Sequence, residues 1–311
     1  MTGLWIAGGV VVAIALLSHF KTSRADGTLV KRVHPYRRLM WFIMPTRNES
    51  VVYYDDYVNA EPLLEYLAEA KQKFHVDITH ALVAAVNIGL NECPTMNHFV
   101  VGRRMYLRKH RAITFSMKRQ AMNKKAKIAV VKLHMEDSEN FRDLCDRMGG
   151  NIKQQRSGKK THADKEFQLF NVLPRTALRC FTSVFKVLDY LNILPYKAFI
   201  KTDGLYTSCV IANLGSLGMS AAYHHLYEWG TCSLFLMAGR IEERPVVEDG
   251  QVVVRKTLHL RYSYDERIDD GLSSSYGMAA VKRVLENPRE SLGCLAEDGS
   301  DASPLIETGQ A

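Results

Sequence analysis

Residues 264–271 read YDERIDDG and form the densest polar cluster of the chain. Residues 257–264, just before it, alternate between apolar and polar side chains and predict a strand, whereas residues 273–285, just after it, predict a helix. Four carboxylates and an arginine within six positions cannot all be buried and charged, so some must pair with Arg267 and others must face solvent or a cleft. From the residues alone, an ordinary polar turn is favoured over a functional site.

Two other clusters precede this turn. Residues 213–218, NLGSLG, follow a predicted strand, and their glycines permit tight turns, but they match neither a dinucleotide fingerprint nor a P-loop. Residues 223–230, YHHLYEWG, place His224 and His225 near Glu228. Such a group can form structural hydrogen bonds, do acid–base chemistry or bind a metal. A metal is the least favoured of these, because adjacent histidines rarely chelate one ion well.

Helices and strands are mixed along the chain, with clear antiparallel hairpins, which indicates the α+β class with a mixed sheet. A hairpin is predicted around the Asp249-Gly250 turn. The remaining elements are helices at residues 61–74, 81–90 and 136–148, and strands at residues 51–57, 99–101, 105–107, 112–117, 127–133, 208–212 and 231–238.

The 311 residues carry a formal charge of +8, and the segment after Arg289 carries −5, so residues 1–289 carry +13. A basic body suggests an anionic partner such as a membrane surface or a phosphate-bearing ligand. Nucleic acid is not expected, because the basic residues are dispersed and match no recognition motif. The six scattered cysteines predict reduced thiols and no structural zinc site.

The amino-terminal run at residues 4–20 has no charged side chain. Its 17 residues span about 25 Å as a helix, just enough to cross a bilayer. Basic residues follow it, so the sequence predicts a single-pass transmembrane anchor at 1–20 with the body in the cytoplasm. A cleaved signal peptide and a buried core helix are the alternatives. A basic linker is expected at 21–36 and an acidic disordered tail at 289–311.

The segment at residues 174–195 predicts a basic helix with one apolar face. Two interpretations stay open. The helix can pack in the core or against another subunit, or it can lie in a membrane interface.

The order of these segments resembles the catalytic domain of the dihydrolipoamide acyltransferases of 2-oxoacid dehydrogenase complexes. These have the chloramphenicol acetyltransferase-like fold, and the resemblance covers residues 37–288. The segments YHHLYEWG, at residues 223–230, and DERI-x-DG, at residues 265–271, are similar to those of a stand-alone branch of that superfamily. Proteins of that branch lack lipoyl and peripheral subunit-binding domains. The resemblance implies a homotrimer with active sites between subunits.

The family motif is Asp-His-Arg-x-x-Asp-Gly, and this chain departs from it. The catalytic histidine falls on Glu266, whereas the aspartate that orders an arginine is kept as Asp270. The serine or threonine that holds the tetrahedral oxyanion falls on Ala212. The loss of one such donor can reduce the rate by about 10²–10³.

The resemblance therefore implies an acyltransferase that uses a thioester donor, either acyl-CoA or an acyl carrier, an unknown acceptor and no tightly bound cofactor. Coenzyme A contacts are expected at Asn213, Gly215 and Arg267. Three readings of the missing histidine stay open. Glu266 acts as base with a raised pKa, His224 or His225 supplies the imidazole, or the domain is a non-catalytic trimeric scaffold or acyl-carrier-binding module.

Overall fold

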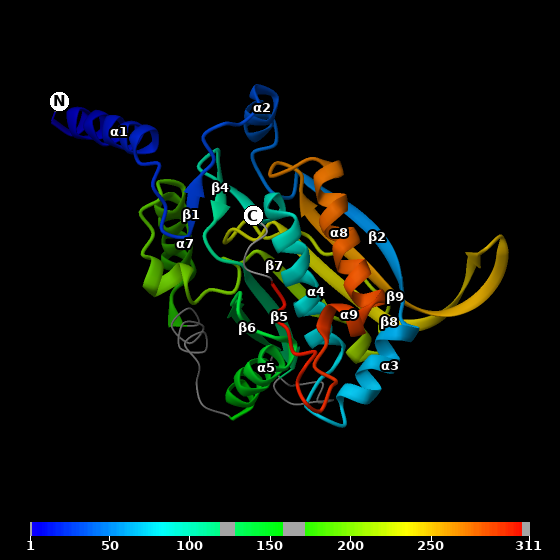
Figure 1. The fold of residues 1–311 in the computed structure, drawn as a ribbon. Helices are drawn as coiled ribbons and strands as arrows, with labels where there is room; N and C mark the ends of the chain where they lie inside the picture. The colour runs from blue at the N-terminus through cyan, green and yellow to red at the C-terminus, as the bar shows by residue number, and fades with distance from the viewer. Residues whose placement is uncertain (1, 119–127, 158–171, 307–311) are drawn as a thin grey trace.

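A six-stranded mixed sheet forms the centre of the computed structural model, which describes residues 2–118, 128–157 and 172–306 (Figure 1). The strand order is β2-β9-β8-β7-β5-β6. Strands β5, β7 and β8 run parallel, and the other pairs are antiparallel, as the α+β prediction requires. The strands are β2 (Val51–Asn59), β5 (Ala112–Lys118), β6 (Ile128–His134), β7 (Cys209–Asn213), β8 (Leu234–Glu248) and β9 (Gln251–Asp265).

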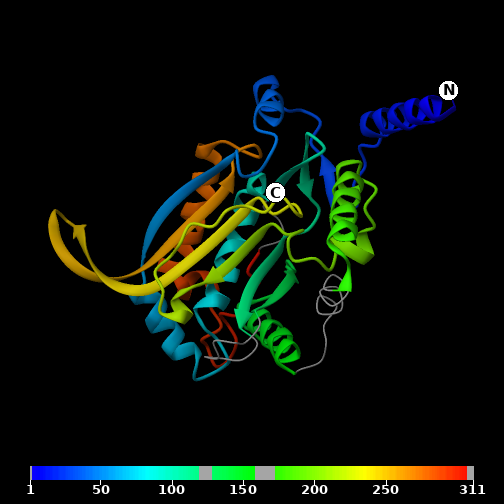
Figure 2. The ribbon, with the colours of Figure 1, turned by 180° about the vertical axis from the view of Figure 1, so that it is seen from behind.

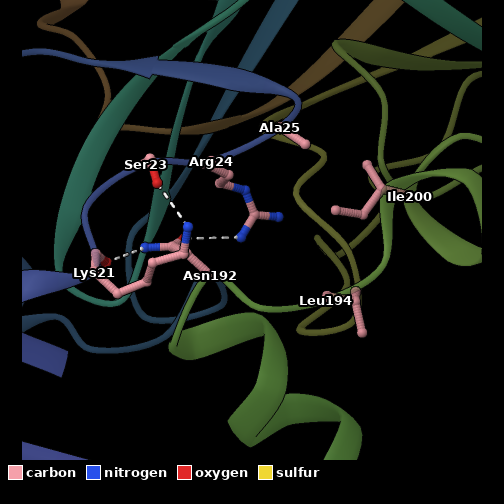
Figure 3. A pocket seen from close by; sticks show the side chains of 7 residues that line it. All are labelled: Lys21, Ser23, Arg24, Ala25, Asn192, Leu194 and Ile200. Atoms are coloured by element: carbon pink, nitrogen blue, oxygen red, sulfur yellow. Dashed lines mark hydrogen bonds between the residues drawn. The ribbon is translucent and has the colours of Figure 1, made fainter. Parts of the chain in front are cut away.

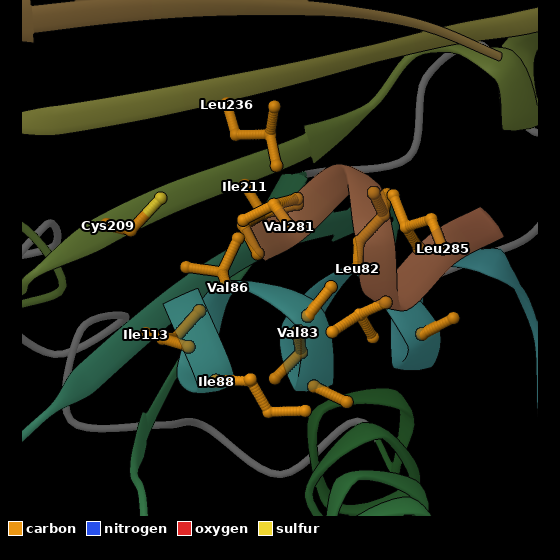
Figure 4. Packing of buried hydrophobic residues seen from close by; sticks show 14 of the residues in the cluster. Leu82, Val83, Val86, Ile88, Ile113, Cys209, Ile211, Leu236, Val281 and Leu285 are labelled. Carbon is orange, nitrogen blue, oxygen red and sulfur yellow. The ribbon is translucent and has the colours of Figure 1, made fainter. Parts of the chain in front are cut away.

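Helices cover one face of this sheet. They are α3 (Glu61–Ala70), α4 (Ile78–Glu92), α5 (Phe141–Arg156) and α8 (Gly271–Glu286). Figure 4 shows side chains of α4 and α8 meeting those of the sheet, among them Leu82, Val281 and Ile211. Asp77 caps α4 with hydrogen bonds to the amides of Thr79 and His80 in the first turn, so the helix begins three residues before the predicted range of 81–90. This packed layer is the main core.

The opposite face of the sheet is the side turned away from α4 and α8 (Figure 2). The segment between β7 and β8 crosses it and buries a smaller apolar cluster around Leu226, Phe235 and Met237. Further along the strands this face becomes polar, because Asp55, His259 and Arg261 point to it by strand alternation. We call it the open face.

β8 and β9 continue beyond the sheet as a long hairpin that projects from the body (Figures 1 and 2). Its turn has positive φ at Asp249 and Gly250, which confirms the predicted Asp-Gly turn. A β-bulge in β8 interrupts the pairing with β9 between Ala238 and Ile241. A bulge of this kind bends the strand, here at the point where the hairpin leaves the core.

A small second sheet, β1-β4-β3, ties the predicted linker to the body. Within residues 21–36, Arg24 and Asp26 are buried and Gly27 pairs with Arg108. The linker is therefore part of the fold over these positions. The elements here are β1 (Gly27–Leu29), α2 (Pro35–Ile43), η1 (Pro94–Asn97), β3 (His98–Val101) and β4 (Arg104–Arg108).

Helix α7 (Arg175–Tyr190) is the basic amphipathic helix of the sequence. Its Phe185 is buried and stacks on Trp229 with ring centroids 4.4 Å apart. Val184 and Val187 are exposed. One face of α7 therefore packs against the body, as the first of the two interpretations expects, and the π-helical turn η2 (Tyr196–Ile200) follows it.

The predicted transmembrane helix is wrong. Helix α1 (Thr2–Phe20) forms and extends away from the sheet (Figure 1), yet within the described residues no helix is long and apolar enough to span a bilayer. The apolar run of about 25 Å is shorter than a hydrocarbon core of roughly 30 Å. Its last turn is polar at His19, whose carbonyl accepts a hydrogen bond of 3.1 Å from Arg104. A buried core helix does not fit either, because Trp5 and Phe20 are exposed.

The predicted acidic tail differs from the structure over residues 289–306. Helix α9 (Pro288–Leu292) follows α8, and Leu305 and Ile306 are buried in the main core. The Leu305 amide donates to the Glu139 carbonyl at 2.9 Å. Apolar side chains spaced among the acidic residues explain this packing. Residues 307–311 lie outside the described part.

Candidate functional site

The turn at residues 264–271 is built around a buried ion pair. The Arg267 guanidinium donates to both Asp265 carboxylate oxygens, from Nε and Nη2, at 2.8 Å each. Its Nη1 donates to the carbonyls of Met44 and Pro45 at 3.2 and 3.0 Å. Arg267, expected to contact coenzyme A, thus has partners inside the protein at all three guanidinium nitrogens.

Glu266 sits on this rigid support with its side chain exposed. Its backbone N–H donates to the Ser50 carbonyl at 3.0 Å, and its carbonyl accepts from Arg37 Nη1 at 3.2 Å. Within the described residues its carboxylate has no hydrogen-bond or ion-pair partner. A group that approaches this side chain from outside therefore meets a free carboxylate held on a fixed backbone.

Asp270, which the chain keeps from the family motif, is the N-cap of α8. Its Oδ1 accepts from the Ser273 amide at 2.8 Å, and this hydrogen bond holds the pKa of Asp270 below its usual range. The resemblance implies that this aspartate orders an arginine. In the structure Asp265 pairs with Arg267 instead, and Asp270 faces solvent.

The histidine pair lies at the same end of the sheet as Glu266. The His224 ring stacks on Phe235 at 4.2 Å and on His225 at 4.6 Å, and its Nδ1 is 2.7 Å from the His225 carbonyl. Phe235 is paired with Ser263 on β9. Ser263 precedes Glu266 by three residues, so Phe235 joins the histidine pair to the strand that leads into the Glu266 turn. Among the contacts of the described residues, none joins either histidine to Glu266.

Asn213 and Gly215 shape the loop at the end of β7, which continues as η3 (Gly215–Leu217). The Asn213 side chain accepts from the Ser216 amide at 3.1 Å and donates to Thr79 Oγ1 at 3.2 Å. A Cβ on Gly215 would lie 2.5 Å from the Gly239 carbonyl oxygen. The glycine is therefore required for the loop to approach β8 so closely.

Ala212 presents a methyl group where the resemblance expects a hydroxyl. It is half-buried on β7, opposite Met237 on β8, and packs against the apolar cluster of the open face. The position can exclude water but cannot donate a hydrogen bond to an oxyanion.

Sequence reasoning missed a polar cluster centred on Asp55. Its Oδ1 accepts from His259 Nε2 at 2.6 Å and from Arg261 Nε at 2.8 Å, and its Oδ2 accepts from the Tyr223 hydroxyl. Partial burial opposes ionisation, but these hydrogen bonds lower the pKa of Asp55 to about 2. An imidazole on a fixed carboxylate is a common acid–base arrangement. The residues of this cluster come from β2, β9 and the segment before β8. Their proximity depends on the register between β2 and β9, which the sequence alone does not give.

A cavity of about 320 Å³ lies between the amino-terminal segment and the chain after α7 (Figure 3). Arg24 forms ion pairs with Asp26 at 2.6 Å and Asp189 at 2.8 Å and donates to Asn192 Oδ1 at 3.2 Å. Because the polar groups that line it are already paired, this cavity is a structural junction. Its lining residues are Lys21, Ser23, Arg24, Ala25, Asn192, Leu194 and Ile200.

Another cavity, about 220 Å³, lies on the open face, where His259 and Arg261 of the Asp55 cluster line it together with Arg240 and Arg244. Across the described ranges, no group of three His, Cys, Asp or Glu side chains is arranged to hold a metal ion.

Comparison with known proteins supports the resemblance. The family described as 2-oxoacid dehydrogenases acyltransferase (catalytic domain) matches residues 202–293. The dihydrolipoyllysine-residue acetyltransferase components of the pyruvate dehydrogenase complexes of Staphylococcus epidermidis and Staphylococcus aureus are 34% identical over 119 residues. The match covers 34% of this chain and 25% of each relative, so the chain spans about a quarter of their length.

Solved structures show the same fold over most of the chain. A probable dihydrolipoamide acetyltransferase from Listeria monocytogenes has a TM-score of 0.55 at 16% identity, covering 92% of this chain and 98% of that one. A dihydrolipoamide acetyltransferase of Azotobacter vinelandii has a TM-score of 0.53 at 17% identity, covering 84% and 93%. That enzyme was investigated for the roles of a serine, a histidine and an asparagine in its catalytic mechanism.

A truncated catalytic core of the 2-oxoacid dehydrogenase multienzyme complex from Thermoplasma acidophilum has a TM-score of 0.51 at 18% identity, covering 84% of this chain and 99% of that one. The predicted fold is thereby confirmed, apart from the transmembrane helix. The chain has the fold of the dihydrolipoamide acyltransferase catalytic domain, and the sequence of its carboxyl-terminal third resembles that family.

Proposed function

We propose that this protein transfers an acyl group from a thioester donor, expected to be acyl-CoA, to a hydroxyl, amine or thiol acceptor. One observation carries the proposal. The family match at residues 202–293 includes all three polar clusters, 213–218, 223–230 and 264–271, on a fold shared with acyltransferases.

The chemistry requires one base. The acceptor attacks the thioester carbonyl carbon, and the tetrahedral intermediate collapses by breaking the C–S bond. The base takes the acceptor's proton and returns it to the departing thiolate. We assign this role to Glu266, with His224 or His225 as the alternative, and we assign Asp270 to the support of the turn by capping α8.

A carboxylate with an ordinary pKa of about 4.3 is a weak base for a thiol unless burial raises that pKa. Glu266 is exposed in a single chain, so its burial needs another molecule. We therefore propose a homotrimer in which a neighbouring copy covers Glu266 and completes the site. With a methyl group at Ala212, the oxyanion depends on other donors such as backbone N–H groups.

Turnover of the full chain tests the proposal. Release of coenzyme A from acetyl-CoA and longer acyl-CoAs is followed with a thiol acceptor. Glu266→Gln is expected to lower kcat by about 10²–10⁴, the usual contribution of a general base. Glu243→Gln, an exposed glutamate on the hairpin, is the matched control and should retain the wild-type rate.

The histidines are tested in the same assay. Loss of turnover in His225→Ala with full activity in Glu266→Gln would move the base to the imidazole pair. Wild-type turnover no faster than that of the Glu266→Gln/His225→Ala double variant would contradict acyl transfer.

A second function, a non-catalytic trimeric scaffold or acyl-carrier-binding module, is favoured by the loss of both the catalytic histidine, at Glu266, and the oxyanion hydroxyl, at Ala212. It predicts a trimer by light scattering and saturable binding of an acyl carrier, with no coenzyme A release above the double variant.

A further inference from the structure

We propose that the 220 Å³ cavity on the open face is a binding site for a phosphate group. Arg240 and Arg244 reach it from β8, Arg261 and His259 from β9, and the Tyr57 ring from β2. This inference does not depend on acyl transfer.

The cavity is separate from the turn that carries Glu266. His259 precedes Glu266 by seven residues on the extended chain of β9, which corresponds to about 23 Å. It borders the Gly215 loop instead, since Arg240 Nη1 donates to the Gly218 carbonyl at 3.4 Å. A ligand held here is therefore recognised by a set of residues that no motif of the sequence identified.

The charge of the cavity is positive after its internal pairs are counted. Arg240 pairs with Glu242 at 2.5 Å, and Arg261 pairs with Asp55 at 2.8 Å. Arg244 forms no ion pair within the described residues. Three guanidiniums against two carboxylates leave +1 with His259 neutral, and that charge resides on Arg244.

The free guanidinium is positioned beside aromatic and imidazole rings. The Arg244 guanidinium lies 4.1 Å from the centroid of the Tyr57 ring, and the His259 ring stacks on the same tyrosine at 4.3 Å. Asp55 in turn fixes His259 at 2.6 Å. Because the Arg244 guanidinium is already held against the Tyr57 ring, it loses little conformational entropy when a ligand binds.

The other donor groups are also fixed before any ligand arrives. Arg261 donates from Nη1 to the Ala221 carbonyl at 3.0 Å, in addition to its bond to Asp55, and lies 4.3 Å over the Tyr223 ring. Guanidinium groups bind phosphate and carboxylate oxygens through paired hydrogen bonds. A phosphate group offers more acceptor oxygens and more negative charge than a carboxylate, so a cavity lined by three guanidiniums favours phosphate.

The experiment measures binding of inorganic pyrophosphate to the full chain by titration calorimetry at low and at physiological salt. We expect saturable binding that weakens with salt. Arg244→Gln should weaken it by about tenfold or more, because a charge-assisted contact is lost. Arg255→Gln is the matched control. Arg255 lies on the same hairpin but is paired with Glu248 and Glu61, and its replacement should leave the dissociation constant unchanged.

Coenzyme A, used as a second probe, identifies the source of the phosphate. If coenzyme A also loses affinity in Arg244→Gln and is displaced by pyrophosphate, the phosphate belongs to a nucleotide-bearing ligand. If coenzyme A binding is insensitive to Arg244→Gln while pyrophosphate binding is not, the site serves a different phosphorylated ligand. Both results support the proposal.

Three results overturn it. These are no saturable binding of pyrophosphate by the wild type, equal affinities in Arg244→Gln and Arg255→Gln, or preferential binding of succinate over pyrophosphate. Circular dichroism of the variants verifies that each is folded. Since Glu266 takes no part in this site, Glu266→Gln should bind pyrophosphate as the wild type does, so a failure of acyl transfer and a failure of this site are distinguishable.

Discussion

Asp265 and Arg267 form a bidentate ion pair inside the protein, with two hydrogen bonds of 2.8 Å and side chains that are 0% and 4% exposed. The pair closes the turn that presents Glu266. A buried charge that loses its partner is left without compensation, so the turn depends on both residues.

Removal of one partner should therefore destabilise the fold strongly. We expect Asp265→Ala to lower the free energy of unfolding by about 3–5 kcal/mol in a urea titration. Arg289→Gln, which breaks the exposed pair with Glu69, should cost less than about 1 kcal/mol. If the two variants are equally stable, the buried pair is not what holds the turn.

The Asp55 cluster predicts a pH dependence with a defined sign. The folded-state pKa of about 2 lies below the unfolded value of about 3.9, so the ionised carboxylate stabilises the fold above about pH 4. That contribution is lost as the pH falls through 2. Tyr223→Phe removes one hydrogen-bond donor and should raise the pKa of Asp55 in a carbon-detected NMR titration.

The control for this titration is Tyr227→Phe. Tyr227 contacts the neighbouring histidine rings and has no bond to Asp55, so its replacement should leave the titration unchanged. An Asp55 pKa that is the same in wild type and Tyr223→Phe would show that the hydroxyl contributes nothing.

Lys132 on β6 should make the stability of the fold depend on pH above about pH 7. Burial lowers its pKa to about 7, although its Nζ donates to the carbonyls of Ile200 and Asp203 at 2.7 and 3.1 Å. Between about pH 7 and 10 the unfolded chain then binds more protons at this group than the folded chain, so its contribution to stability rises with pH. Lys132→Met should lack this rise in thermal unfolding, whereas exposed Lys71→Met should keep it.

Gly215 predicts a steric effect. A methyl group there would lie 2.5 Å from the Gly239 carbonyl oxygen, so Gly215→Ala should lower the free energy of unfolding by about 1–3 kcal/mol. Gly149 in α5 has no atom within 4 Å of its Cβ position, and Gly149→Ala should stabilise the protein by about 0.5–1 kcal/mol. Equal stability of the two variants in urea would contradict the tight approach of the loop to β8.

Local patterns in the sequence correctly predicted turns and helices, which depend mainly on interactions between residues that are close in sequence. The Asp249-Gly250 turn formed as predicted, because aspartate and glycine tolerate the positive φ that such a turn needs at both positions. The helix predicted at 81–90 also formed, as part of α4. The order of the clusters at 213–218, 223–230 and 264–271 also identified the fold. The same local reading was wrong for α1, where an uncharged run near the lower length limit was read as a bilayer span.

The sequence by itself determined the α+β class, the motif turn that contains Glu266, and the place of Ala212 just before the cluster at 213–218. Only the tertiary structure decided that Arg267 pairs with Asp265 and that Asp270 caps α8. It also brought Asp55 to His259, more than 200 positions along the chain, and placed Arg244 over the Tyr57 ring. Turns and caps follow from neighbours in sequence, whereas such clusters depend on the register between distant strands, and a shift of one residue would send every side chain to the other face.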